Sequence, residues 1–146
     1  MKPLLCKAGQ QLREQFDDVY PDRDRSSDGW IADSRHIAAG TSDHIPCSKT
    51  GYVRAIDVDR DVSGKSKPDL MPYIIDQIVR ACKTKSETRI SYIIFDGFIY
   101  SSKFRFIKRK YTGANKHNHH AHFSFKKEAD LLGEFYQIPM LGASNE

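Results

Sequence analysis

The sequence predicts an α+β fold in which a small, mostly antiparallel sheet is flanked by helices. Helical patterns occur early and in the middle of the chain, whereas the second half is rich in hairpin signals. A length of 146 residues is enough for one domain with its own hydrophobic core. We therefore expect a single domain over residues 1–146.

The first half of the chain begins with a helical pattern. Leu12 and Phe16 stand at i,i+4 spacing, which predicts a short amphipathic helix over Ala8–Phe16. Turn residues and apolar runs predict the following elements of this half: a loop at 20–29, a short helix at 31–39, a second loop at 40–51 and a strand at 52–58.

The second half contains the strongest helix signal and the strongest hairpin signal. Pro68 suits the first turn of a helix, and apolar residues recur at helical spacing up to Lys83. Asp96-Gly97 lies between two apolar, β-branched runs and predicts a hairpin. The elements expected here are a hairpin of strands 89–95 and 98–101, strands at 104–108 and 120–125, and a short helix from 127 that frays after 139.

Composition and charge restrict the kinds of partner and the cellular location that we expect for this chain. The formal net charge of +4 is compatible with an anionic partner, and much of it lies in Lys103–Lys110, a run more typical of a solvated strand face. No apolar run is long enough to span a bilayer, and the residues after Met1 do not form a signal-peptide core. We expect a protein made in a cytoplasm and not embedded in a membrane.

Four of the six histidines lie between His117 and His122, which marks this run as a candidate metal site. In a strand, side chains alternate between two faces. One face of the final strand would carry His120, His122 and Ser124, and the other, apolar face would carry Ala121, Phe123 and Phe125. Two imidazoles would therefore stand side by side.

Further metal ligands are available upstream. His44 lies in the loop before the strand that carries Asp57, so that one loop-strand unit offers an imidazole and a carboxylate. Asp59 has the same strand parity as Asp57 and is a rival ligand. A catalytic zinc site has three protein ligands and one position for water, so His44, an aspartate and a later histidine would suffice.

Taken together, these motifs resemble those of the LAS-type zinc peptidases, which include D-Ala-D-Ala carboxypeptidases, murein endopeptidases and M15-like phage endolysins. The matching segments are Ser42-Asp43-His44, Ala55-Ile56-Asp57-Val58 and His120-Ala121-His122. With His117 the last segment becomes a His-x-x-His-x-His array. Asp22-Arg23 and Ser27-Asp28-Gly29-Trp30-Ile31 resemble the opening of phage members. The match covers about Ala8 to Phe125, which leaves no room for a separate cell-wall-binding domain.

The resemblance assigns roles to individual residues. It implies a LAS/hedgehog-like peptidase fold, with Zn²⁺ as the cofactor and His44, Asp57 and His122 as its ligands. His117 would act as the general base, and His120 would stabilise the oxyanion. Ser42 and Arg54 become candidates for substrate contacts, whereas His119 would point to the wrong face.

Two departures from the family pattern concern the site. The loop from Ile45 to Tyr52 is longer than the usual spacing between the first two ligands, and we expect it to bulge at the rim of the site. The frequent Glu-x-x-Trp before the final ligand is absent, so His117 would take over the role of that glutamate.

The function that the resemblance implies is zinc-dependent cleavage of peptidoglycan stem or cross-link peptides, by a carboxypeptidase or endopeptidase serving as a phage endolysin. Such a protein would be made in the host cytoplasm without a signal peptide and would act on the cell wall after release, with possible dependence on a holin. We expect a monomer that binds peptidoglycan peptides and no nucleic acid.

Two alternatives belong to other classes. A non-catalytic, zinc-stabilised binding module would need a fourth ligand, for which Cys47 near His44 is the candidate. A metal-dependent nuclease is suggested by the letters of His117-Asn118-His119, but that nuclease motif spreads its residues over a ββα unit and not over three adjacent positions.

Overall fold

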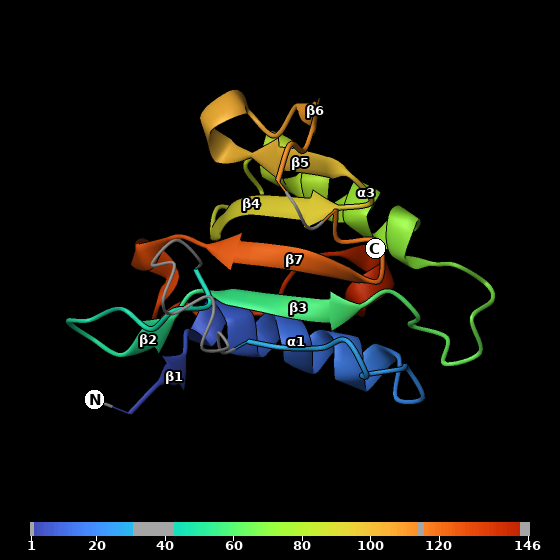
Figure 1. Ribbon diagram of the computed structural model, residues 1–146, viewed down its shortest axis with the longest axis horizontal. Coiled ribbons are helices and arrows are strands. Elements are labelled where there is room, and N and C mark those ends of the chain that lie inside the picture. The colour runs from blue at the N-terminus through green and yellow to red at the C-terminus, as the bar shows by residue number, and fades with distance from the viewer. Residues whose placement is uncertain (1, 31–42, 114–115, 144–146) are drawn as a thin grey trace.

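The computed structural model describes residues 2–30, 43–113 and 116–143, and it has the expected α+β architecture (Figure 1). Two helices, α1 (Lys7–Val19) and α3 (Met71–Lys83), accompany the strands of this part of the chain. The strands are β1 (Leu4–Leu5), β2 (Tyr52–Val53), β3 (Ala55–Asp59), β4 (Ile90–Phe95), β5 (Phe98–Ser101), β6 (Lys108–Lys110) and β7 (His120–Phe125).

The main sheet has five antiparallel strands in the order β3-β7-β4-β5-β6. The last strand in the sequence, β7, is therefore inserted between β3 and β4, as Figure 1 shows. Asp57 of β3 lies directly opposite His122 of β7, and His122 in turn lies opposite Ile94 of β4. A separate parallel pair is formed by β1 and β2.

The two described helices, α1 and α3, lie against one face of the sheet (Figure 1). Ala121, Phe123 and Phe125 belong to the buried core, where the ring of Phe123 lies 6.1 Å from that of Phe16 in α1. The predicted alternation along β7 is thus confirmed. Because successive side chains point to opposite faces, His120 and His122 lie on the face away from the helices.

The β4-β5 hairpin forms where the sequence predicts it. Asp96 and Gly97 have φ angles of 54° and 85°, so both central residues of the two-residue turn are left-handed. This is the geometry of a type I′ turn, which matches the twist of the two strands and favours Asp-Gly. The turn also holds a later segment of the chain, because the amides of Asp96 and Gly97 donate hydrogen bonds to the carbonyls of His117 and Lys116.

Two expected elements have different limits. The predicted strand at 52–58 is divided at Arg54, because β2 pairs with β1 whereas β3 pairs with β7. The predicted helix at 68–83 begins only at Met71. Pro72, and not Pro68, occupies its first turn, where a residue without an N–H leaves no hydrogen bond unmade.

The strand expected at 104–108 is wrong. Ser102–Phe104 form a 3₁₀ turn, and Arg105 and Phe106 have φ angles of 56° and 60°, which no strand accommodates. The left-handed pair turns the Phe106 side chain into the core, where it is 7% exposed. The edge strand β6 starts only at Lys108 and pairs with β5.

The C-terminal segment is more ordered than expected. The helix predicted from Lys127 is a single 3₁₀ turn, Lys127–Ala129. Fraying after Pro139 is wrong for the described residues, because Pro139–Leu141 form another 3₁₀ turn and Leu141 is buried. The side-chain amide of Gln15 in α1 donates to the carbonyl of Leu141 and fixes this end on the helix.

The short helix expected at 31–39 and the start of the loop at 40–51 lie outside the described residues. Among those described, neither α1 nor α3 has the length and apolar character needed to cross a bilayer.

Candidate metal centre

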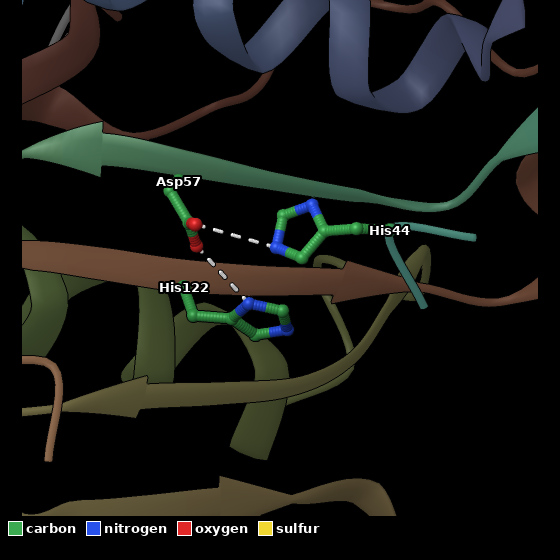
Figure 2. Close-up of side chains that lie close together, drawn as sticks. All are labelled: His44, Asp57 and His122. Carbon is green, nitrogen blue, oxygen red and sulfur yellow. Dashed lines mark hydrogen bonds and ion pairs between the residues drawn. The ribbon is translucent and has the colours of Figure 1, made fainter. Parts of the chain in front are cut away.

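Three potential metal ligands converge from distant parts of the chain. Asp57 comes from β3, His122 from the adjacent β7, and His44 from a turn that precedes β2. One ligand atom from each lies within 4.8 Å of the other two. Figure 2 shows the Asp57 carboxylate with one oxygen directed toward each imidazole. The sequence prediction therefore selected residues that the fold brings together.

The distances pair each oxygen of Asp57 with one ring. Oδ1 lies 3.1 Å from Nδ1 of His122, and Oδ2 lies 3.3 Å from Nε2 of His44. Asp57 and His122 meet because they occupy facing positions on antiparallel strands and share one face of the sheet. Both histidines are buried, which holds their rings in a single arrangement.

The backbone of Trp30 orients His44. Nδ1 of His44 lies 2.9 Å from the carbonyl oxygen of Trp30, so in the neutral ring this nitrogen carries the proton and donates it. Nε2 then has a lone pair directed at the carboxylate. Histidine ligands of metals are commonly held in this way, with the second ring nitrogen donating to a carbonyl.

Ser124 and Tyr92 hold His122. Nε2 of His122 lies 2.7 Å from the hydroxyl oxygen of Ser124, a fully buried residue two positions along the same strand. The Tyr92 ring stacks on the imidazole with centroids 5.4 Å apart, and its hydroxyl donates to Oδ2 of Asp43. In the sequence, the only sign of these contacts is that Ser124 has the same strand parity as His122. No sequence pattern indicates the contact with Tyr92.

The charge of Asp57 is strongly favoured at this position. Burial alone would raise the pKa of its carboxyl, but hydrogen bonds from His122 and His44 and their charges lower it far below the ordinary value. Burial would also lower the pKa of His44, yet the hydrogen bond and charge of Asp57 raise it. The carboxylate thus attracts a positive charge, whether a proton or a metal ion.

His117 and His120 form a second group around the same carboxylate. Nε2 of His120 lies 3.6 Å from Oδ2 of Asp57, and with His117 these residues also have ligand atoms within 4.8 Å of one another. The His117 ring contacts those of His120 and His122, with centroid distances of 4.9 Å and 5.4 Å. All four predicted site histidines therefore surround Asp57.

Surroundings distinguish the two groups. The nitrogen of His120 that faces Asp57, Nε2, is buried and lies 3.6 Å from the carboxylate without a hydrogen-bond partner among the described residues, whereas the facing nitrogens of His44 and His122 lie at 3.3 Å and 3.1 Å and their second nitrogens are held by Trp30 and Ser124. Burial, reinforced by the charges of His122 and His44, lowers the pKa of His120 against the opposing effect of Asp57. His44, Asp57 and His122 therefore have the supported arrangement expected of ligands, and His120 is a neutral group beside them.

Asp59, the rival carboxylate, is engaged elsewhere. Its Oδ2 accepts hydrogen bonds from the backbone and hydroxyl of Ser27 and from the hydroxyl of Ser26. Its Oδ1 accepts from the backbone of Asp61, and Asp59 belongs to neither ligand group. Asp59 organises the loop before Gly29, and Asp57 is the carboxylate that faces the histidines.

The remaining predicted residues lie at the margins of the centre. Arg54 forms a bidentate ion pair with Asp130, so its guanidinium anchors the C-terminal segment. The contact of Arg54 with substrate stays a prediction. Ser42 lies outside the described residues. A hydrogen bond with Thr50 lowers the pKa of the Cys47 thiol to about 7, but Cys47 is in neither ligand group. His119 is exposed, as its parity predicts.

Comparisons with models of protein families, with curated proteins and with solved structures found no match.

Proposed function

We propose that this chain is a zinc-dependent peptidase of the LAS type that cleaves stem or cross-link peptides of peptidoglycan and serves as a phage endolysin. The observation that carries the proposal is the cluster of His44, Asp57 and His122 (Figure 2), with the second ligand group of His117 and His120 around the same carboxylate. The order of these residues along the chain is that of the family motifs.

The ligand set fits zinc in number and in kind. Two imidazoles and one carboxylate provide the nitrogen and oxygen ligands that zinc binds, and three protein ligands leave a fourth position for water or substrate. In the neutral ring of His44, the lone pair of Nε2 faces a carboxylate oxygen at 3.3 Å, so two acceptors meet. A bound cation between them would satisfy both atoms.

Bound zinc would supply a polarised scissile carbonyl and a water acidic enough to attack at neutral pH. The protein's own contribution is to hold the ligands and to move protons. Asp57 provides the negative charge, Trp30 and Ser124 fix the two ligand rings, and His117 and His120 are the groups that can exchange a proton with substrate.

The family pattern gives the base role to His117 and the stabilisation of the oxyanion to His120. His120 has a lowered pKa, so it is neutral at rest and would carry a positive charge only after taking up a proton during the reaction. The contact between the two rings, with centroids 4.9 Å apart, is consistent with shared handling of one proton.

The alternatives gain less support from the described residues. A closed structural zinc site needs a fourth ligand, and neither ligand group contains a cysteine. The tripeptide His117-Asn118-His119 does not form one nuclease-like site, because His117 is buried at the candidate metal centre whereas Asn118 and His119 are exposed.

Two parallel assays test the proposal. The zinc-loaded protein should clear a suspension of purified cell walls and should leave supercoiled DNA intact. His122→Ala should lose both zinc and clearing, and His117→Ala should keep zinc but lose clearing. Full clearing by His122→Ala, or nicking of DNA that depends on the same histidines, would overturn the assignment.

A further inference from the structure

A cationic cavity lies apart from the candidate metal centre. It has a volume of about 470 Å³ and opens at the C-terminal end of α3, between that helix, the 3₁₀ turn after β5 and the residue that follows β7. Four basic residues from these separate segments line it: Lys83, Lys85, Arg105 and Lys126. None of the residues assigned to the metal centre is among its lining.

The positive charge of this cavity is not neutralised locally. Its one lining carboxylate, Glu87, is buried and held by Arg89, with Oε1 2.7 Å from Nη2 and Oε2 2.9 Å from Nε. None of the four lining cations forms an ion pair within the described part of the chain. Like charges gathered in a concave site attract an anion and repel one another when none is bound.

Backbone strain accompanies the charge. Lys85 and Arg105 have φ angles of 64° and 56°, and Phe106, which forms part of the wall, has a φ of 60°. Lys85 follows the end of α3, where glycine is the favoured residue because a Cβ is strained there. The chain thus places two long cations where glycine would be more stable, and such strain concentrates at functional sites.

The helix dipole explains only part of this arrangement. Cations near the C-terminus of a helix are stabilising, which accounts for Lys83 and Lys85 as capping charges. Arg105 and Lys126 come from other segments, so capping of their own helix does not account for their presence in this cavity. The hydroxyls of Thr88 and Ser102 add neutral hydrogen-bond donors to the same cavity.

We propose that this cavity binds the phosphate groups of a phosphodiester polymer, and, if the proposed function holds, that the polymer is an anionic component of the cell wall. A phosphate offers several acceptor oxygens to converging cations and hydroxyls. Proteins that bind single-stranded nucleic acid without sequence preference stack bases on aromatic rings. Phe106 is the only aromatic lining residue, and it is buried. The cavity therefore fits a sugar- or polyol-phosphate chain better than a nucleic acid.

The conformation of Lys85 and Arg105 permits a variant that removes charge without harming the fold. In Lys85→Gly/Arg105→Gly, glycine replaces two residues with positive φ, so the melting temperature should stay the same or rise. The matched control is Lys2→Ala/Lys65→Ala, which removes the same charge from two exposed positions outside the cavity.

Fluorescence anisotropy with labelled poly(glycerol phosphate) tests the binding. The unmodified protein should bind saturably and be displaced by inorganic pyrophosphate. The glycine variant should bind at least about tenfold more weakly, because charged hydrogen bonds are lost, and the control should change less than about twofold. Equal weakening in both variants would reduce the effect to net charge and overturn the proposal, as would absence of binding.

Two further measurements distinguish failure of the choice of polymer from failure of the proposed peptidase activity. Tighter binding of a single-stranded oligonucleotide with the same number of phosphates would contradict the choice of a wall polymer. Hydrolysis of phosphate-free muropeptides should be the same in the glycine variant and the unmodified protein, so that failure of the proposed peptidase activity is distinguishable from failure of the cavity to bind phosphate.

Discussion

His44 and Asp57 face each other across 3.3 Å with two atoms that both accept hydrogen bonds when the histidine is neutral. The carbonyl of Trp30 fixes the proton of His44 on Nδ1, and the lone pair of Nε2 therefore points at the carboxylate oxygen Oδ2. Such a pair is favourable only with a positive charge in between, either a proton on the ring or a metal ion.

Replacing Asp57 should remove metal binding. Asp57→Asn deletes the only carboxylate shared by the two ligand groups, so zinc affinity should fall by more than about 100-fold, beyond the usual effect of losing an outer partner. Zinc content after dialysis and titration with a chromophoric chelator measure this loss. Asp59→Asn is the matched control: it should keep zinc while losing about 1–3 kcal/mol of stability from the hydrogen bonds of the Ser26–Ser27 loop. Equal zinc loss in both variants would contradict the assignment.

Ser124 should influence zinc binding through His122. In Ser124→Ala the buried Nε2 of His122 loses its partner at 2.7 Å, and zinc affinity should fall about 10–100-fold with the three ligands intact. Ser91→Ala in β4 is the control, because Ser91 has no side-chain hydrogen bond to the site among the described residues. If both variants bind zinc like the unmodified protein, Ser124 does not position the ligand.

The pH dependence of the metal-free protein should report the charge pair. Because the pKa of His44 is raised on folding, its contribution is present below its unfolded value of about 6.5 and is lost as pH rises through the folded value. Asp57 has a lowered pKa, so its contribution is present above about 3.9 and is lost only as pH falls. His120, whose pKa is also lowered, opposes His44 by favouring the unfolded state below about 6.5.

Urea unfolding in the presence of a chelator tests this balance. The loss of stability in His44→Gln should be largest near pH 6 and should shrink toward pH 9. His120→Gln should gain stability relative to the unmodified protein at acid pH. Zinc affinity should rise over the range in which His44 loses its proton, since the ion and the proton compete for Nε2. A pH-independent effect of His44→Gln would contradict the pairing.

The turn at Asp96-Gly97 should support activity at a distance from the ligands. Gly97 has a φ of 85°, so Gly97→Ala should cost about 1–2 kcal/mol although no atom would clash with the new Cβ. The turn amides hold the backbone of Lys116 and His117, so hydrolysis should fall more than zinc binding does. Gly29→Ala, which likewise meets no atom within 4 Å, is the control, and it should leave stability closer to that of the unmodified protein.

The sequence predicted those features of the site that depend on local periodicity. Alternation along 120–125 separates His122 from Phe123, and the hairpin follows from Asp96-Gly97. Periodicity could not choose between Asp57 and Asp59, because both have the same parity. The choice depends on a loop more than 25 residues earlier in the chain, in which the amide and hydroxyl of Ser27 donate hydrogen bonds to the Asp59 carboxylate.

The features that the sequence did not predict arise from tertiary contacts. Arg105 and Phe106 look like strand residues by composition, but burial of the Phe106 ring turns the backbone into the left-handed region. Arg54 looks like a site residue by its position before Asp57, yet its guanidinium pairs with Asp130. The Trp30 carbonyl that orients His44 is a backbone atom, which no side-chain motif encodes.

The proposed function requires the histidine and aspartate cluster to hold a zinc ion that enables peptide hydrolysis in the cell wall. This requirement can be tested by mass spectrometry of purified muropeptides, incubated with the chelated protein and with the same protein after one equivalent of zinc is restored. We predict intact muropeptides in the first sample and products with one newly hydrolysed amide bond in the second. Unchanged muropeptides with a protein that demonstrably retains one zinc per chain would contradict the proposed function.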